Sequence, residues 1–307
     1  MSRIDVLAFG EPLAEFAEVE REGARVFLPG IGGDASNAAV AAARQGASTA
    51  FFTALGDDAF GRDILAMWDR EGVDRSGVIL RERGDTGVYF ITYGPSGHVF
   101  TYRRAGSAAS LVTAAELPLG LIAGARVLHV SGISQAISPS CRDAVLAAIR
   151  HARASGAAVS YDTNLRLRLW PLIEARAAIH EAVALCDIAL PGLDDARLLT
   201  GETSPDAIVD FYLRLGPRIV ALTLGREGAL VATPTERRLI PARPVEAIDA
   251  TGAGDAFDGA FLAEWTRHAD PFRAGAYANA AAALSTLKHG AIPAIPTRAE
   301  VEAFMLT

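Results

Sequence analysis

The segment from Asp249 to Asp255, with the sequence DATGAGD, combines a glycine-rich turn with an acid at a point where a helix is expected to begin. Apolar residues recur at helical spacing just downstream, from Phe257 to Trp265. The backbone amides of Gly252 to Gly254 should therefore lie unpaired at the positive end of a helix dipole, where they could stabilise a developing phosphoryl charge. Asp255, in the first turn, could accept a proton from an attacking hydroxyl. The same pattern is also typical of an ordinary helix cap. Other parts of the sequence are needed to distinguish a phosphoryl-transfer site from such a cap.

A second glycine-rich segment, GIGGDASN, runs from Gly30 to Asn37. Its glycines, Gly33 among them, permit a ligand to approach the backbone closely, and Asp34 and Asn37 could bind sugar hydroxyls. The segment fails the dinucleotide-binding pattern, because Ala35 occupies the position of the third glycine and no strand immediately precedes it. This disfavours an NAD-dependent oxidoreductase and leaves a helix cap made by Asp34 as the simpler alternative.

Two common nucleotide-binding patterns are missing from the sequence. No G-x-x-x-x-G-K-[ST] occurs, and the nearest approach, from Gly56 to Asp63, has Arg62 and Asp63 where Lys and Ser or Thr are required. The glycine loop, catalytic loop and metal-binding Asp of protein kinases are missing as well. These absences exclude a P-loop NTPase and a protein kinase.

Composition bounds the class of protein. With 307 residues, half of them hydrophobic, the chain can bury a large core. The net charge of −7 argues against a nucleic-acid binder, and no apolar run is long enough to suggest a membrane anchor. The first ten residues read as a strand rather than a secretory signal, so we expect a cytoplasmic protein. Cys141 and Cys186 lack any disulfide or zinc spacing, and we expect buried free thiols.

Strand-like and Ala-rich helical segments alternate along the chain. The expected strands are 4–10, 49–54, 127–131, 158–162, 188–191 and 218–224. The expected helices are 35–45, 61–71, 138–155, 170–185, 204–215, 254–267 and 273–287. This alternation predicts one α/β domain over residues 1–307, with a Rossmann-like, mostly parallel sheet flanked by helices. Such a sheet binds its ligands at the carboxyl edge.

Two segments, about 11–30 and 85–105, interrupt the alternation. In the second, residues from Thr86 to Tyr93 alternate in the manner of a strand. We expect both segments to form antiparallel strands that pair into a small sheet standing off the core. A lid of this kind would exclude water from a phosphoryl-transfer site.

The two glycine-rich motifs, one near each end of the chain, resemble the PfkB (ribokinase-like) family of carbohydrate kinases. The first signature of that family corresponds to the stretch from Gly32 through Gly46, followed by the stretch from Leu55 to Gly61, and the second to Asp249 through Asp255. The resemblance covers essentially the whole chain. It implies a ribokinase-like fold with a β-sheet lid, ATP with Mg²⁺, and phosphorylation of a sugar hydroxyl. Asp255 would be the base, and Gly252, Ala253 and Gly254 the anion hole.

The same resemblance implies which residues bind the nucleotide. The stretch from Leu222 to Gly228 looks like the turn that family members place at the ATP phosphates and ribose, which makes Thr223, Gly225 and Gly228 candidates together with Thr251 and Gly252. Asn279 matches a position near the base. A simple β-turn would also use Gly225 and Gly228.

Further pieces resemble 2-keto-3-deoxygluconate kinases within that family. They are Gly10-Glu11-Pro12, the stretch from Tyr102 to Ser110, and the stretch from Ser160 to Arg166 that runs on to Trp170. A sugar acid carries a carboxylate, which an Arg side chain can bind bidentately, so Arg104 and Arg166 are the candidates. Surface salt bridges are the alternative for both.

The remaining sugar-side candidates are Tyr89, Tyr102, Asn164 and the backbone of Gly33. Tyr89 and Tyr102 would offer a phenol and an apolar face, although core packing is the commoner fate of such residues.

Two departures from the family pattern concern the metal and the sugar. Many members have an Asn-x-x-Glu element that organises Mg²⁺, whereas Gly192-Leu193-Asp194-Asp195 stands here, which leaves Asp195 as the candidate in place of Glu. Arg103 stands where the related kinases often have a second Tyr.

We therefore expect ATP-dependent phosphorylation of the terminal hydroxyl of a sugar acid, 2-keto-3-deoxygluconate above all. The alternatives are a fructokinase- or ribokinase-type kinase of a neutral sugar or nucleoside, and a non-catalytic sugar-binding relative. The expected partners are the sugar and ATP, with no nucleic acid and no membrane. An exposed lid would leave edges for a second subunit, so we expect at least a homodimer.

Overall fold

The structure is a computed structural model that describes residues 3–94 and 97–306. Its centre is a nine-stranded sheet with the order β15-β14-β13-β12-β11-β10-β1-β4-β6. The strands are β1 (Ile4–Phe9), β4 (Thr49–Phe52), β6 (Val73–Asp74), β10 (Ala125–Ser131), β11 (Ala158–Asp162), β12 (Ile188–Leu190), β13 (Ile219–Thr223), β14 (Ala229–Ala232) and β15 (Arg237–Ile240). The strands from β6 to β13 pair in parallel, and β14 and β15 join antiparallel. The expected fold class, a mostly parallel α/β sheet, is confirmed.

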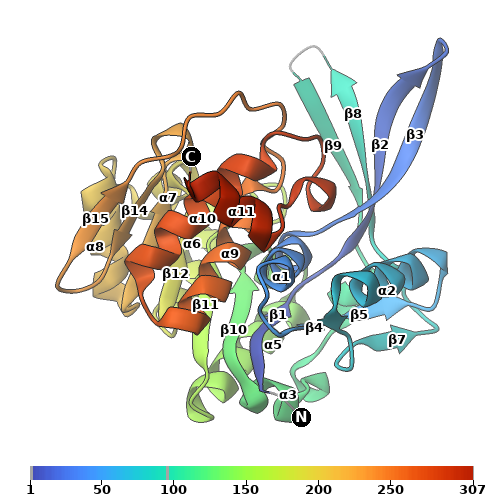
Figure 1. Cartoon of the computed structure of the whole chain (residues 1–307). Coiled ribbons are helices and arrows are strands. Elements are labelled where there is room, and N and C mark those ends of the chain that lie inside the picture. Colours follow the sequence, from blue (N-terminus) through green and yellow to red (C-terminus); the bar gives the residue numbers. More distant parts are fainter. Residues whose placement is uncertain (1–2, 95–96, 307) are drawn as a thin grey trace.

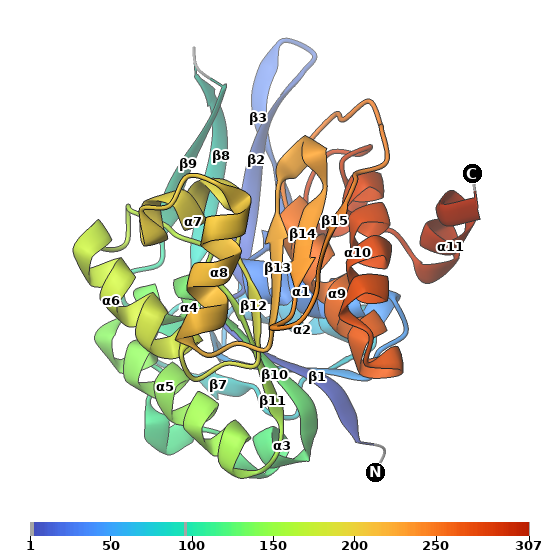
Figure 2. The same cartoon turned by 90° about the vertical axis from the view of Figure 1, so that its left-hand side faces the viewer.

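Helices cover both faces of this sheet (Figure 2). One layer holds α1 (Asp34–Arg44), α2 (Ala59–Glu71), α9 (Ala253–His268) and α10 (Pro271–Ser285), with α11 (Arg298–Leu306) against α10. The other holds α3 (Leu119–Gly124), α4 (Gly132–Ala136), α5 (Pro139–Ala154), α6 (Leu172–Val183), α7 (Leu193–Thr200) and α8 (Pro205–Leu215). No helix in the described part of the chain has the length and apolar character needed to cross a membrane.

The alternation of side chains along the buried strands explains the two layers. In β1, Leu7 packs into the core beneath α5, while its neighbour Val6 packs into the core beneath α9. The paired residues of β10 divide in the same way, with Leu128 in the first core and Val127 in the second. Because successive side chains of a strand point to opposite faces, a fully apolar strand requires a helix on each side.

Several helices and strands of the structure were not predicted from the sequence. The short helix α7 and the antiparallel edge strands β14 and β15 were not expected, nor was a separate two-stranded sheet of β5 (Ala54–Gly56) and β7 (Ile79–Arg81). These strands are only three or four residues long. Segments this short do not display a periodicity that distinguishes a strand from a loop.

The two interrupting segments form a four-stranded sheet with the order β3-β2-β8-β9, which projects from the body of the molecule (Figure 1). Its strands are β2 (Leu13–Arg21), β3 (Ala24–Gly32), β8 (Val88–Gly94) and β9 (Gly97–Arg103). The hairpins β2–β3 and β8–β9 are antiparallel, but β2 and β8 pair in parallel. The expectation of antiparallel strands was therefore wrong at the junction of the two hairpins. Both hairpins leave the body in the same direction, which places β2 and β8 side by side in parallel.

Close packing of α1 on α9 sets the position of the two helices that carry the glycine motifs. Gly259 of α9 faces α1, and a Cβ atom on it would overlap the carbonyl oxygen of Ala38 and lie 2.5 Å from the Cβ of Ala41. The contact is backbone against backbone, so neither helix can adjust without moving as a whole.

We predict that Gly259→Ala destabilises the protein by about 1–3 kcal/mol, because the added methyl group overpacks the α1–α9 contact. Gly120→Ala is the matched control, since Gly120 lies in exposed α3 with open space at its Cβ position. Urea unfolding followed by circular dichroism measures both. Equal free energies of unfolding for the two variants would contradict the close contact.

Candidate active site

A cavity of about 500 Å³ lies between the lid sheet and the carboxyl edge of the central sheet. The predicted residues that line it are Gly33, Asp34, Asn37, Tyr89, Tyr102, Arg104, Asn164, Arg166, Thr251, Gly252 and Asp255. They come from the lid, from α1, from the loop after β11 and from the start of α9. The structure thus brings together every predicted sugar-side residue with the predicted base.

Asp255 lies in the first turn of α9, three residues after Gly252. The φ of 75° at Gly252 is the left-handed conformation that glycine adopts without strain. The Asn37 side-chain amide donates to the Asp255 carboxylate at 2.8 Å. Burial, reinforced by the nearby Asp34 charge, raises the pKa of Asp255 to about 7. At neutral pH a large fraction of Asp255 is therefore ionised and able to accept a proton.

The start of α9 offers backbone donors beside this carboxylate. Within the described residues, the amide N–H groups of Gly252 and Gly254 donate no backbone hydrogen bond, although the Gly252 carbonyl oxygen accepts one from the Ala256 amide at 2.8 Å. The Ala253 amide, which we expected in the anion hole, donates at 3.2 Å to the carbonyl oxygen of Ala250. Gly252 and Gly254 thus provide the amides that are free to bind an anion at this helix end.

Asp34 and Asn37 hold unused acceptor atoms in the same cavity. One oxygen of Asp34 accepts hydrogen bonds from the Ser131 hydroxyl at 2.5 Å and from the Asn164 amide at 3.1 Å. Over the described part of the chain, the other Asp34 oxygen and the side-chain oxygen of Asn37 are buried without a partner. Buried acceptors are nearly always satisfied, so this pair fits a ligand that donates hydroxyl groups, as a sugar does.

The Arg104 guanidinium, a predicted carboxylate anchor, forms an ion pair with Glu11. Glu11 is fully buried and also accepts a hydrogen bond from the Ser107 hydroxyl at 2.7 Å. Burial raises the pKa of Glu11, and the adjacent Arg104 opposes that effect. The charge of Arg104 is thus largely balanced inside the protein. Glu11 belongs to the Gly10-Glu11-Pro12 motif, but its pairing with Arg104 was not predicted.

Arg166 is the more available of the two predicted anchors. Half of its side chain is exposed, and its guanidinium lies 3.9 Å from the Asp195 carboxylate. A second guanidinium on the same loop, that of Arg168, lines the cavity and donates at 2.9 Å to the carbonyl oxygen of Phe100 in the lid. Arg168 was not among the predicted residues, although its place two positions after Arg166 was a usable signal.

Tyr89 is held in the lid by a hydrogen bond from its hydroxyl to Glu15. Its ring stacks on Tyr102, with ring centroids 5.5 Å apart. Burial raises the pKa of Tyr89, and that of Glu15 as well. A Cβ atom on Gly32 would overlap the Tyr89 hydroxyl, so glycine is required there to admit the ring. Glu15 was another residue that the sequence did not single out.

Of the predicted nucleotide-side residues, Thr251 and Gly252 line the sugar cavity, whereas Thr223, Gly225, Gly228 and Asn279 do not. Thr223 ends β13 and bridges to Gly192. Gly228 has a φ of 105°, and a Cβ atom there would overlap the carbonyl oxygen of Ile240. The Asn279 amide donates to that same oxygen at 2.9 Å. Gly228 and Asn279 thus have structural contacts, and their nucleotide roles stay predictions.

Asp195 is the predicted metal ligand. One of its carboxylate oxygens accepts a hydrogen bond from the backbone amide of Leu165 at 2.9 Å. Burial raises the pKa of Asp195. Among the described residues, no three His, Cys, Asp or Glu side chains form a group able to hold a metal ion. This donor set does not form a protein cage, but it fits a Mg²⁺ carried by phosphates and water, which requires few protein carboxylates.

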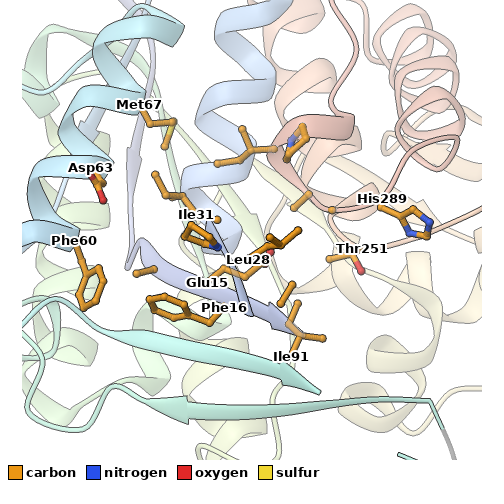
Figure 3. Close-up of a pocket in the computed structure, with 18 of the residues that line it drawn as sticks. Glu15, Phe16, Leu28, Ile31, Phe60, Asp63, Met67, Ile91, Thr251 and His289 are labelled. Atoms are coloured by element: carbon orange, nitrogen blue, oxygen red, sulfur yellow. The ribbon is translucent and has the colours of Figure 1, made fainter. Parts of the chain in front are cut away.

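A second, larger cavity of about 800 Å³ lies beside the first and was not foreseen (Figure 3). Phe60, Asp63 and Met67 project into it from α2, Leu28 comes from the lid, and His289 lies across from them. Thr251 and Ala291 line both cavities, which therefore meet beside the start of α9.

The chain matches the pfkB family carbohydrate kinase model over residues 4–298. It belongs to that family. Fructokinase-1 of Zea mays is 37% identical over 310 residues, covering 96% of both chains. The 2-dehydro-3-deoxygluconokinase of Bacillus subtilis (strain 168) is 33% identical over 313 residues, covering 99% of this chain and 96% of that one.

Solved structures give the same assignment. A putative ribokinase II from E. coli, in complex with ATP and Mg²⁺, superposes with a TM-score of 0.90 at 27% identity, covering 99% of each chain. A fructokinase from Xylella fastidiosa with bound ATP gives a TM-score of 0.90 at 25% identity, covering 98% of each. This pfkB kinase is thus a sugar phosphotransferase with the ribokinase-like fold.

We predict that kcat/KM of this kinase rises with pH around a midpoint of about 7, because Asp255 accepts the substrate proton only when it is ionised. Asp255→Asn should lower kcat about 10²- to 10⁴-fold and abolish this dependence. Steady-state ADP release over a range of pH measures both. Asp206→Asn, at an exposed carboxylate of α8, is the control and should change nothing; near-wild-type turnover of Asp255→Asn would refute the assigned base.

Proposed function

We propose that this kinase transfers a phosphoryl group from ATP to the terminal hydroxyl of a sugar acid, most specifically 2-keto-3-deoxygluconate. The observation that carries the proposal is the pair of guanidinium groups, Arg166 and Arg168, on one loop at the sugar cavity. Within the described residues Arg168 has no ion pair, and Arg166 has only its pair with Asp195 at 3.9 Å. Two such groups suit a carboxylate, which a neutral sugar lacks.

The proposed reaction uses the residues gathered at the start of α9. Asp255 takes the proton of the terminal hydroxyl, whose oxygen attacks the γ-phosphorus in line, while the Gly252 and Gly254 amides stabilise the transferring group. The side-chain oxygens of Asp34 and Asn37 accept hydrogen bonds from the sugar hydroxyls and so orient the substrate. Ala253 would contribute a third amide once its 3.2 Å bond to Ala250 opens.

For the nucleotide, we propose that ATP occupies the edge of the sheet beside Thr223, Gly225 and Gly228, with Asn279 near the base and Thr251 near the phosphates. The Mg²⁺ that accompanies ATP would supply charge neutralisation at the phosphates. Asp195 could contribute to its water shell. The ribokinase II and fructokinase relatives with bound ATP support this proposal.

A fructokinase is the second candidate. The Zea mays fructokinase is 37% identical to this chain, and the balance of Arg104 by Glu11 removes one of the two predicted anchors for a carboxylate. A ribokinase-type or nucleoside kinase would use the same base and amides. A non-catalytic sugar-binding relative is disfavoured, because Asp255 and its free glycine amides are in place.

Arg166→Ala should lower kcat/KM for 2-keto-3-deoxygluconate about 10- to 100-fold, because a charge-assisted bidentate hydrogen bond contributes about 1.5–3 kcal/mol. The loss for fructose should be much smaller. ATP consumption with a panel of sugars measures this, with Arg150→Ala, at an exposed position of α5, as the control. Equal losses on acid and neutral sugars would refute the carboxylate role.

We also propose a homodimer formed through the lid. Phe27 and Leu28 of edge strand β3 are 38% and 36% exposed, and Leu28 lines the larger cavity, so apolar surface is available there (Figure 3). We propose the cytoplasm as the location, in keeping with the free thiols of Cys141 and Cys186.

Leu28→Glu should convert the dimer to a monomer, since it places a charge in the proposed apolar interface. Ile173→Glu, at an exposed position of α6, is the matched control and should stay dimeric. Light scattering coupled to gel filtration at micromolar concentration gives the mass. A monomeric wild-type protein would overturn the proposal.

A further inference from the structure

The guanidinium of Arg44, in the last turn of α1, joins two segments that are far apart in the sequence. Its Nε and Nη2 atoms donate to the two carboxylate oxygens of Glu71, the last residue of α2, at 2.8 and 2.7 Å. Its Nη1 atom donates to the carbonyl oxygens of Ile292 and Ile295 at 2.9 and 2.6 Å. The planar fork of a guanidinium allows this double contact, because it carries donors on more than one edge.

The neighbouring residue, Gln45, binds the same segment. Its buried side-chain amide donates at 2.7 Å to the carbonyl oxygen of Pro296, and its side-chain oxygen accepts a hydrogen bond from the Tyr277 hydroxyl at 2.8 Å. The last two residues at the end of α1 thus bind three carbonyl groups within residues 292–296. These carbonyl groups lie in and just after the 3-10 turn Ile292–Ala294, and carbonyl groups at the end of a helical turn require donors from elsewhere.

The 290–296 segment lies against the turn that precedes α9. The Gly290 amide donates at 2.9 Å to a carboxylate oxygen of Asp249, at the start of that turn. A Cβ atom on Gly252 would lie 2.8 Å from the Cβ atom of Ala291, so the backbone of the turn is in close contact with the segment. A shift of the segment would therefore displace the Gly252 amide.

We propose that Arg44 is a positioning residue that holds the 290–296 segment against the turn before α9 and so fixes the Gly252 amide. The proposal rests on the proposed role of that amide in phosphoryl transfer. An amide in an anion hole acts on the transferring group only at the correct distance, so its displacement slows the reaction without weakening the binding of the sugar. The effect of Arg44 should consequently fall on kcat.

Apolar packing is the other force that holds this segment. Ile292 and Ile295 are buried in the same core cluster as Val40 of α1 and Trp68 of α2. Such packing is not directional, whereas hydrogen bonds to two carbonyl oxygens also fix the orientation of the backbone. Only the second contribution depends on the donors of residue 44, so substitution of Arg44 separates the two.

The test breaks the ion pair from each of its two ends. Arg44→Met keeps the apolar stem but removes every donor, so kcat should fall about 10- to 100-fold while KM for the sugar stays within about twofold. Glu71→Gln leaves Arg44 able to bind both carbonyl groups, and its kcat should stay within about twofold of wild type. Steady-state ADP release, with the sugar that the panel identifies, measures both.

Arg81→Met is the matched control. Arg81 forms an ion pair with Glu116 at 2.7 Å, their side chains are 22% and 29% exposed, and those of Arg44 and Glu71 are each 20% exposed. Arg81 lines neither of the two cavities, so its substitution should leave kcat unchanged. Arg44→Lys keeps the charge but not the planar fork, and it should lower kcat less than Arg44→Met does.

A second measurement needs no substrate and so stands apart from the proposed function. Hydrogen exchange followed by mass spectrometry reports local opening of the backbone. Peptides that cover residues 288–296 should exchange faster in Arg44→Met than in wild type. In Glu71→Gln they should exchange at the wild-type rate, because the bonds from Arg44 to the carbonyl groups remain.

Three results would overturn the proposal. One is a folded Arg44→Met variant with the kcat of wild type. Another is a Glu71→Gln variant whose kcat falls as far as that of Arg44→Met, because Arg44 would then act only through the ion pair. The third is unchanged hydrogen exchange over residues 288–296 in Arg44→Met. If Arg44→Met does not fold, Arg44→Lys decides in its place. A panel that identifies a neutral sugar would refute the sugar acid but leave these comparisons intact.

Discussion

The structure depends on the burial of several carboxyl groups close together at one edge of the sheet. The charges of Asp34, Asp255 and Asp162 each raise the pKa of at least one neighbouring carboxyl in this group, and the pKa of Asp258 is raised by all three. Such a cluster is tolerable only where donors satisfy it or protons remain bound. The Asn37 and Asn164 amides and the Ser131 hydroxyl supply donors, and their positions fix α1, α9 and the β11 loop relative to one another.

The lid completes this arrangement by contributing charge and aromatic rings from outside the core. The parallel pairing of β2 with β8 places Glu15 beside Tyr89, and the two are joined by a hydrogen bond. Glu11, where the chain leaves β1 for the lid, pairs with Arg104 where the chain returns. The base of the lid is therefore held by a buried ion pair, while the part above the cavity is free to present aromatic surface to a sugar.

Local sequence was a good guide wherever a residue's role follows from its neighbours in the chain. The glycine turn before Asp255, the helix that follows it and the alternating strands of the core all depend on short-range spacing. Roles that depend on a distant partner were less predictable. Arg104 had the right type for a carboxylate anchor, yet Glu11, which is 93 positions earlier by residue number, balances its charge. Glu15 was not singled out for the same reason, since its partner Tyr89 lies on another strand of the lid.

The sequence by itself determined the fold class, the kinase family and the gathering of the glycine motifs with Asp255, because these follow from periodicity and contiguous motifs. Only the tertiary structure decided which predicted guanidinium is the more exposed, which amides at the start of α9 are unpaired and which donors satisfy the clustered carboxyls. These are properties of burial and of distances between residues far apart in the chain. Asp34 shows the difference, since nothing in its local sequence indicates that Asn164, in the loop after β11, donates to its carboxylate.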